Sequence, residues 1–345
     1  MLMRGLFEGV LPAAPALASH LDRCLACRTC EAVCPSGVKY GQLIDAGRAE
    51  LARGGSRPKG LGATLARWLP DALSSKLLLG AVGRLRFRER YPAQGERRGA
   101  VALFLGCAAR MIDARTLRAA IFVLTRLGYE VHVPRAQGCC GAMHQHGGEP
   151  ARAEDLARRN VAAFNPLSHQ GRGEDMPILF SASGCGASLV EYDRYGEDGE
   201  AFARRATDIV SFLAQAQGWE AADIAPLPVS IVVHEPCSAR NVLRNAADSY
   251  RLLERIPRAR VAALPGNDQC CGAAGLYFLG QPEMAGALRA DKMQAVRGGE
   301  ARYLVSTNYG CAHWLAKGLR DEGISVDVMH PVALLAKQMG FTETC

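Results

Sequence analysis

The sequence predicts an α/β fold in which a small helical N-terminal segment precedes two copies of one α/β unit. From about residue 100 onward, short apolar runs alternate with amphipathic stretches, as expected for strands and helices in parallel layers. In the same region eight cysteines form two matching sets, and four more form a tight run near the N-terminus. The first two observations predict the repeated units, and the third sets the N-terminal segment apart.

The first α/β unit begins with an unbroken apolar run at 101–106, which predicts a buried strand. Residues 112–128 carry their apolar side chains on one face, which predicts an amphipathic helix closed by Gly128. The further elements expected here are a strand at 129–134, a helix from Glu149 and a strand at 176–183 that leads to Cys185.

The second unit repeats this order of elements. Residues 229–235 predict a strand and residues 238–256 a helix. The remaining expected elements are a strand at 260–265, a helix from Pro282 and a strand at 301–308. Each cysteine set then falls just after strand ends, where open α/β sheets place their ligand sites.

The two cysteine sets match in spacing and in local context. The segment GCAAR at 106–110 corresponds to PCSAR at 236–240, and GCCGA at 138–142 corresponds to QCCGA at 269–273. A shift of about 130 positions brings each cysteine close to its counterpart, which indicates an internal duplication. The first set is Cys107, Cys139, Cys140 and Cys185, and the second is Cys237, Cys270, Cys271 and Cys311.

The N-terminal run has the spacing C-x2-C-x2-C-x3-C-P, a pattern that supplies thiolates to an iron–sulfur cluster. A zinc site would usually require a second C-x2-C or a histidine pair about 12–20 residues further on. Nothing of this kind follows, and polar residues lie between the thiols. The run therefore predicts a [4Fe–4S] cluster, with ligands Cys24, Cys27, Cys30 and Cys34.

The chemistry of the two repeated sets stays open among three interpretations. Adjacent thiolates can grip two corners of an iron–sulfur cluster, four sulfurs also suit zinc, and small residues beside glycines can simply pack. A vicinal pair forms a strained disulfide and is not expected to be oxidised. Because the sulfurs already suffice, four nearby histidines are interpreted as hydrogen-bonding loop residues rather than ligands: His144, His146, His234 and His313.

Composition narrows the class of protein. A chain of 345 residues is expected to hold two or three domains, and thirteen cysteines at ligand-type spacings favour metal in a reducing compartment such as the cytoplasm. The formal charge of +7 falls once thiolates bind iron, so no nucleic-acid partner is expected. No apolar run is long enough for a transmembrane helix, and Glu8 interrupts the short apolar N-terminus, which argues against an export signal.

Residues 24–48, together with the two cysteine sets, resemble the iron–sulfur subunit of glycolate oxidase (glycolate dehydrogenase). They are also similar to the C-type subunits of anaerobic glycerol-3-phosphate dehydrogenase, to lactate-oxidising iron–sulfur proteins and to the B-type subunits of heterodisulfide reductase. The resemblance implies repeated cysteine-rich (CCG) domains. The expected domains are a ferredoxin-like 4Fe–4S domain at 1–55, a linker at 56–98 and CCG domains at 99–222 and 223–345.

The same resemblance implies a function. An FAD-containing partner would oxidise a 2-hydroxy acid, and this chain would pass the electrons towards quinone at the cytoplasmic face of the inner membrane. The sequence itself contains no G-x-G-x-x-G after a strand and no P-loop. Because a hydride acceptor is then missing from this chain, it is expected to conduct electrons without a catalytic residue of its own. A catalytic protein of the heterodisulfide reductase type and a zinc-stabilised scaffold are the alternatives.

The sequence departs from the family pattern in two ways. Relatives usually carry two ferredoxin runs, and only one is present here. In two-cluster ferredoxins the fourth cysteine ligates the other cluster. By that rule Cys24, Cys27 and Cys30 hold one cluster, and Cys34 points towards a second cluster whose other ligands are missing. The missing half would lie on another chain or in a missing segment, or the first cluster would take a fourth ligand elsewhere. Cys345 is a candidate for that ligand, although an exposed, uninvolved tail cysteine is the preferred interpretation. The fuller CCG motif ends in C-x2-C, but Ser188 and Trp314 stand at its last position, which leaves an ordinary or modified [4Fe–4S] cluster or zinc.

Residues 75–90, SKLLLGAVGRLRFRER, are first apolar and then strongly basic. One interpretation is an amphipathic element that rests on an anionic membrane surface, which would make the association with the membrane peripheral. The other is a linker helix that packs between domains and keeps a solvated basic face.

Overall fold

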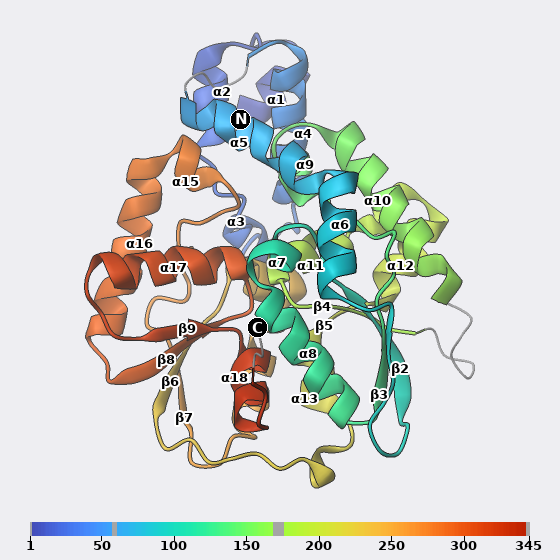
Figure 1. Cartoon of the computed structure of the whole chain (residues 1–345). Helices are drawn as coiled ribbons and strands as arrows, with labels where there is room; N and C mark the ends of the chain where they lie inside the picture. The colour runs from blue at the N-terminus through green and yellow to red at the C-terminus, as the bar shows by residue number, and fades with distance from the viewer. Residues whose placement is uncertain (1, 57–60, 168–175, 343–345) are drawn as a thin grey trace.

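The computed structural model of the chain describes residues 2–56, 61–167 and 176–342. A helical N-terminal part lies above two α/β halves, which pack side by side (Figure 1). Cys345, the tail cysteine considered above, lies outside the described residues.

The N-terminal part consists of four helices around a small apolar core. Its helices are α1 (Leu2–Phe7), α2 (Pro15–Asp22), α3 (Thr29–Ala32) and α4 (Tyr40–Arg53). Its buried residues are Met3, Leu6, Leu17, Ala18, Leu21, Ile44 and Leu51. The cysteine run occupies α3 and the loops on either side of it. Ala26 and Arg28 in this run have φ values of 50° and 58°, a left-handed backbone that residues with a side chain rarely adopt.

Two helices, α5 (Leu61–Ser74) and α6 (Lys76–Arg86), connect this part to the first half. Leu79 of α6 is fully buried in the core of that half, and its carbonyl accepts a hydrogen bond from Arg110 Nη1 at 2.9 Å. α5 instead leaves Leu61 79% and Trp68 72% exposed. Along the described ranges, no helix has the length and apolar character needed to cross a bilayer.

The first half contains a five-stranded sheet in the order β1-β3-β2-β4-β5. The short β1 pairs antiparallel with β3, and all other neighbours are parallel. The strands are β1 (Arg90–Tyr91), β2 (Gly99–Phe104), β3 (Tyr129–His132), β4 (Ile178–Phe180) and β5 (Ala206–Asp208). The helices are α7 (Ala108–Ile112), α8 (Ala114–Arg126), α9 (Ala142–His146), α10 (Pro150–Phe164), α11 (Ser183–Leu189), α12 (Glu197–Arg205) and α13 (Ile209–Gln215).

The second half contains four parallel strands in the order β7-β6-β8-β9. The four parallel strands of the first half have the same order, so the topology repeats along with the cysteines. The strands are β6 (Ser230–His234), β7 (Arg260–Ala263), β8 (Ala301–Ser306) and β9 (Asp327–Met329). The helices are the π-helix η4 (Ser238–Leu243), α14 (Ala246–Leu253), α15 (Tyr277–Gly280), α16 (Pro282–Arg297), α17 (Tyr309–Asp321) and α18 (Pro331–Gln338).

Two predicted elements differ from those observed. The strand expected at 176–183 covers only β4, because the following Ser183 directs its backbone N–H to the carbonyl of Thr307 at 2.8 Å instead of extending the sheet. The helix expected at 238–256 is broken into η4 and α14, because Arg244 between them adopts φ 55°. The predicted strand was therefore too long, and the prediction of one continuous helix was wrong.

The two halves share one hydrophobic core. Helices α8 and α13 of the first half contact α18 of the second between the two sheets (Figure 1). α13 also contacts α14. The side chains Leu117, Leu124, Leu213, Leu252 and Leu334 are fully buried in this core. A shared core of this size holds the strand ends of both sheets, and hence their loops, in fixed relative positions.

Candidate metal centres

The structure gathers the first cysteine set at the carboxyl ends of three strands. Cys107 follows β2, the doublet Cys139–Cys140 follows β3, and Cys185 lies beyond β4 in the first turn of α11. All four side chains are buried, and the Sγ atoms of Cys107 and Cys139 lie 3.3 Å apart. Cys185 is thus placed by a helix and not, as expected, by the strand end itself.

The second set repeats this arrangement. Cys237 follows β6, the doublet Cys270–Cys271 follows β7, and Cys311 lies in the first turn of α17. The thiols form a continuous group, in which Cys237 contacts Cys270 and Cys271 contacts Cys311. Hydrogen bonds from Cys237 and then Cys271 lower the pKa of Cys270, which makes it the thiol of this set most ready to ionise.

A glycine after each doublet lets the loop turn back under the next helix. Gly141 and Gly272 have φ values of 84° and 86°. A Cβ at Gly141 would lie 3.0 Å from the carbonyl oxygen of Ala153, and one at Gly272 would lie 2.5 Å from that of Ala285. Because no other residue fits this backbone and this space, the glycine of the CCG sequence is fixed by the close approach of loop and helix.

An arginine beside each set, fully buried in the first and partly buried in the second, indicates whether the residues suit an anionic metal centre. Arg110 is 1% exposed and lies near Cys107 and Cys139, and its Nε and Nη2 are buried without an acceptor among the described residues. Arg240 lies at the equivalent place in the second half. Its Nη1 is also buried without an acceptor among the described residues. A buried cation requires an anionic partner. Thiolates that bind iron or zinc supply one, so the residues fit such a centre.

The ionisation of the first set fits the same interpretation. The hydrogen bond to Cys139 and burial raise the pKa of Cys107 well above its ordinary value. Contact with Cys185 and burial likewise raise the pKa of Cys140, against the effect of a hydrogen bond from Cys139. These thiols are neutral without a metal, so a metal must displace their protons when it binds.

The N-terminal run divides into three cysteines and one. Burial and then the charges of Cys24 and Cys27 raise the pKa of Cys30, which shows that these three thiols lie close together. The backbone N–H groups of Val38 and Ser36 lower the pKa of Cys34, and none of the other three cysteines contributes to its shift. The structure therefore brings together Cys24, Cys27 and Cys30, whereas the pKa shift of Cys34 arises from the backbone of its own loop.

The four histidines near the repeated sets have different positions. His144 Nδ1 bonds Glu149 Oε2 at 3.1 Å, and His146 Nδ1 bonds Asp45 Oδ1 at 2.8 Å, while His313 is exposed on α17. His234 is not in a loop but ends β6. The remaining contacts of His234 distinguish it from the other three.

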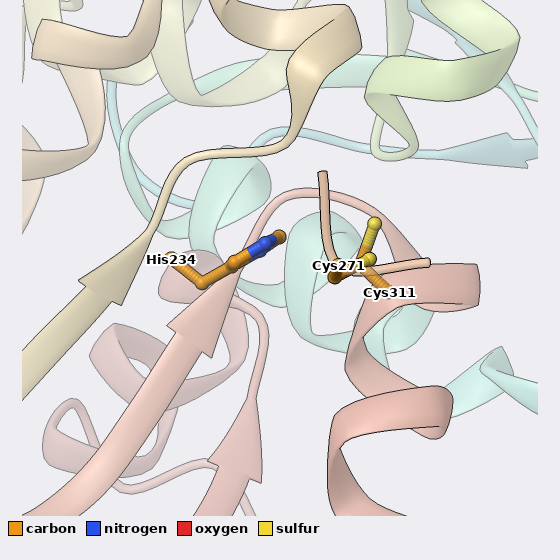
Figure 2. A group of neighbouring side chains, drawn as sticks. All are labelled: His234, Cys271 and Cys311. Carbon is orange, nitrogen blue, oxygen red and sulfur yellow. The ribbon is translucent and has the colours of Figure 1, made fainter. Parts of the chain in front are cut away.

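Figure 2 shows the His234 ring directed from β6 towards Cys271 and Cys311. A ring nitrogen and the two Sγ atoms all lie within 4.8 Å of one another, and all three residues are buried. Within the described residues, this is the one group of three such ligand atoms at so short a spacing. Burial and then the charge of Lys292 lower the pKa of His234 to about 3, so the imidazole is neutral.

The N-terminal run lies against the second set. Asn241 of η4 donates from Nδ2 to the Cys27 carbonyl at 2.7 Å and to Thr29 Oγ1 at 3.1 Å. Tyr277 of α15 donates its hydroxyl to the Arg23 carbonyl at 3.1 Å. The charge of Cys27 also contributes to the raised pKa of Cys237. These contacts make the run and the second set neighbours.

Tyr309 places the second set against the first. It begins α17, two residues before Cys311, yet burial and then the charges of Cys185 and Cys107 raise its pKa. One partly buried side chain thus lies between the two sets, and the three sets form a continuous series. Sequence reasoning missed this residue, because no local pattern indicates a contact between the two halves.

The fold and its thiol sets define a protein built around two copies of a cysteine-rich α/β domain. The family of cysteine-rich domains termed CCG matches the chain twice, at residues 101–190 and 231–316. The chain therefore belongs to the CCG family and, within it, to the relatives of the glycolate oxidase iron–sulfur subunits.

Three relatives cover most of the chain. The glycolate oxidase iron–sulfur subunit of Escherichia coli is 31% identical, over 87% of this chain and 79% of its own length. The probable glycolate oxidase iron–sulfur subunit of Bacillus subtilis is 29% identical, over 98% and 87%. The B-type subunit of the fumarate reductase (CoM/CoB) of Methanothermobacter marburgensis is 27% identical, over 90% and 60%.

Among solved structures, a hypothetical protein from Helicobacter pylori has a similar fold. The TM-score is 0.54 at 12% sequence identity, and the match covers 87% of this chain. The chain spans 58% of that protein's chain. At this identity the likeness concerns the fold alone.

Proposed function

We propose that this chain is the electron-transfer subunit of a flavin-dependent glycolate (2-hydroxy-acid) dehydrogenase complex. The similarity of the chain to iron–sulfur subunits of glycolate oxidase supports the assignment to this enzyme complex. The observation that carries the proposal is the continuous series of the three thiol sets, with Asn241 and Tyr309 at the two junctions. A series of adjacent metal centres is what a chain needs to carry electrons through its interior.

The thiols would hold the carriers. The N-terminal run would hold a [4Fe–4S] cluster through Cys24, Cys27 and Cys30, and Cys34 would complete it or serve a second cluster. The first and second sets would each hold a further iron–sulfur cluster. Bound clusters supply one-electron oxidation and reduction. The chain's own residues separate the centres from water and compensate their negative charge, as Arg110 does beside the first set.

Electron exchange with the FAD-containing partner would take place at the N-terminal run. Cys30 is exposed, and so are the neighbouring apolar side chains Val33, Val38 and Leu43. Exposed apolar side chains around a redox centre suit a docked protein, because they are buried when the partner binds. The partner would supply the substrate pocket, and quinone would accept the electrons.

The complex would lie at the cytoplasmic face of the inner membrane. Leu61, Leu65 and Trp68 of α5 are exposed, and the segment 75–90 that contains the neighbouring α6 is rich in basic residues. An exposed apolar face beside basic residues suits peripheral contact with an anionic bilayer. α6 itself is fixed to the fold through Leu79, so this helix also serves as a linker between domains.

Cys27→Ser tests the electron route. In the reconstituted complex it should abolish reduction of a quinone analogue and leave the oxidation of glycolate by an artificial dye intact, because the dye takes electrons directly from the flavin. Arg204→Ala, an exposed change on α12, is the control and should retain both activities. Loss of both activities in Cys27→Ser would contradict the proposal.

Two alternatives predict other outcomes. A catalytic protein of the heterodisulfide reductase type should turn over a disulfide substrate without a flavoprotein, and the name of the fumarate reductase (CoM/CoB) relative makes this worth measuring. A zinc-stabilised scaffold should contain about one zinc per CCG domain and no acid-labile sulfide there.

A further inference from the structure

The two halves differ at one pair of positions next to their cysteines. In the first half, Phe104 of β2 and Phe180 of β4 are opposite each other at the ends of the central strands. In the second half, His234 of β6 and Ser306 of β8 occupy the same register. At equivalent positions, where the central strands end beside the thiols, the first half therefore has an apolar pair and the second half a polar pair.

The polar pair is arranged as a ligand and its support. His234 Nδ1 and Ser306 Oγ are 3.1 Å apart, and both residues are buried. Histidines that bind metals usually use their second ring nitrogen in a hydrogen bond that fixes the ring. The ring points at Cys271 and Cys311, within 4.8 Å of both sulfurs (Figure 2).

A purely structural role explains these observations less well. The first half shows that two phenylalanines fill the equivalent space, so packing does not require a histidine. Burying an imidazole and a hydroxyl removes both from water, and one mutual hydrogen bond offsets this only in part. Coordination of a metal by the ring would offset the remainder.

A third pair of equivalent positions also differs in its polar groups between the two halves. The eleventh residue of α10 is Asn160, which donates to the carbonyl of Cys139 at 2.8 Å. The eleventh residue of α16 is Lys292, whose buried ammonium group bonds the carbonyl of Gly266 and lies near Cys271. The second site is therefore richer in cationic and nitrogen groups than the first.

We propose that His234, oriented by Ser306, is a nitrogen ligand of the iron–sulfur centre at the second cysteine set. The two CCG domains then hold different centres, an all-thiolate one in the first half and a mixed thiolate and imidazole one in the second. This inference rests on the proposed function, since it requires iron at the second set. A neutral imidazole ligand raises the reduction potential of an iron–sulfur centre, so the second centre should accept electrons more readily than the first.

Nitrogen coordination can be measured directly. The protein is produced with ¹⁵N-labelled histidine, purified anaerobically and reduced with dithionite, and the cluster signals are examined by pulsed EPR. We expect a strong ¹⁵N coupling that is lost in His234→Phe and kept in His144→Gln, which removes a buried histidine near the first doublet. An iron-loaded protein without this coupling, or a coupling that persists in His234→Phe, would overturn the inference.

A reciprocal exchange gives a second readout. His234→Phe should lower the midpoint potential of one centre, and Phe104→His should raise that of another, because the exchange moves the nitrogen from one half to the other. Unchanged potentials in both iron-loaded variants would overturn the inference. If electron delivery from the flavoprotein continues while the ¹⁵N coupling is absent, this inference alone fails, whereas a second set without iron contradicts the proposed function as well.

Discussion

Replacing Arg110 by methionine should have opposite effects on the metal-free and metal-loaded protein. Arg110 is buried, and burial lowers its pKa from 12.5 to about 10. A decrease of this size corresponds to roughly 3 kcal/mol of unfavourable free energy for the charged side chain. In the metal-free protein Cys107 and Cys140 are neutral thiols, so this cost is not offset.

Methionine has a similar length and no charge, so the variant removes this cost. It also removes the hydrogen bond to the Leu79 carbonyl, which is worth about 1 kcal/mol. The metal-free variant should therefore be more stable than the wild type by about 1–2 kcal/mol. With metal bound, the cation faces anionic thiolates, and its removal should weaken metal binding at least about tenfold.

Anaerobic urea unfolding followed by circular dichroism, with and without chelator treatment, measures both effects. Arg126→Met is the control, because the Arg126 guanidinium is exposed and lies over the Phe122 ring at 4.2 Å. Equal changes in the two forms of Arg110→Met would refute the claim that this arginine compensates a metal centre.

Three further predictions concern pH, folding and membrane contact. Metal loading of the first set should strengthen between pH 6 and 8 and release protons to a pH indicator, because the hydrogen bond to Cys139 and burial raise the pKa of Cys107; loading independent of pH would contradict this. Burial raises the pKa of Asp208 to about 7, so the stability it provides at low pH is lost as the pH rises through 7. Thermal unfolding should show that the free energy of unfolding falls by about 1.4 kcal/mol from pH 6 to 9. Asp208→Asn should abolish this decrease, and the exposed control Asp198→Asn should retain it. Trp68→Ser should reduce cosedimentation with anionic vesicles several-fold, and unchanged binding would leave α5 without a membrane role.

The order of elements and the thiol sets could be predicted from the sequence because both depend on local patterns. Apolar runs locate β2 and β6, and the repeated GCAAR and PCSAR segments locate Cys107 and Cys237. The two repeated segments also contain Arg110 and Arg240, although the burial of Arg110 and of Arg240 Nη1 is visible only in the fold.

Other features required tertiary structure. Strands β5 and β9, with the sequences ATD and DVM, contain no unbroken apolar run, so no local pattern predicts them. The pairing of His234 with Ser306 depends on the register of β6 and β8, which lie far apart in the sequence. The approach of Tyr309 to the first set depends on the packing of the two halves, which no local propensity encodes.

Quantification of iron, acid-labile sulfide and zinc in anaerobically purified protein, with EPR of the reduced sample, tests the central claim most directly. We predict a brown protein whose iron and sulfide are nearly equal and exceed the content of one [4Fe–4S] cluster, with signals from more than one reduced centre. A colourless preparation that lacks iron, yet is folded and passes electrons in its complex, would contradict the account.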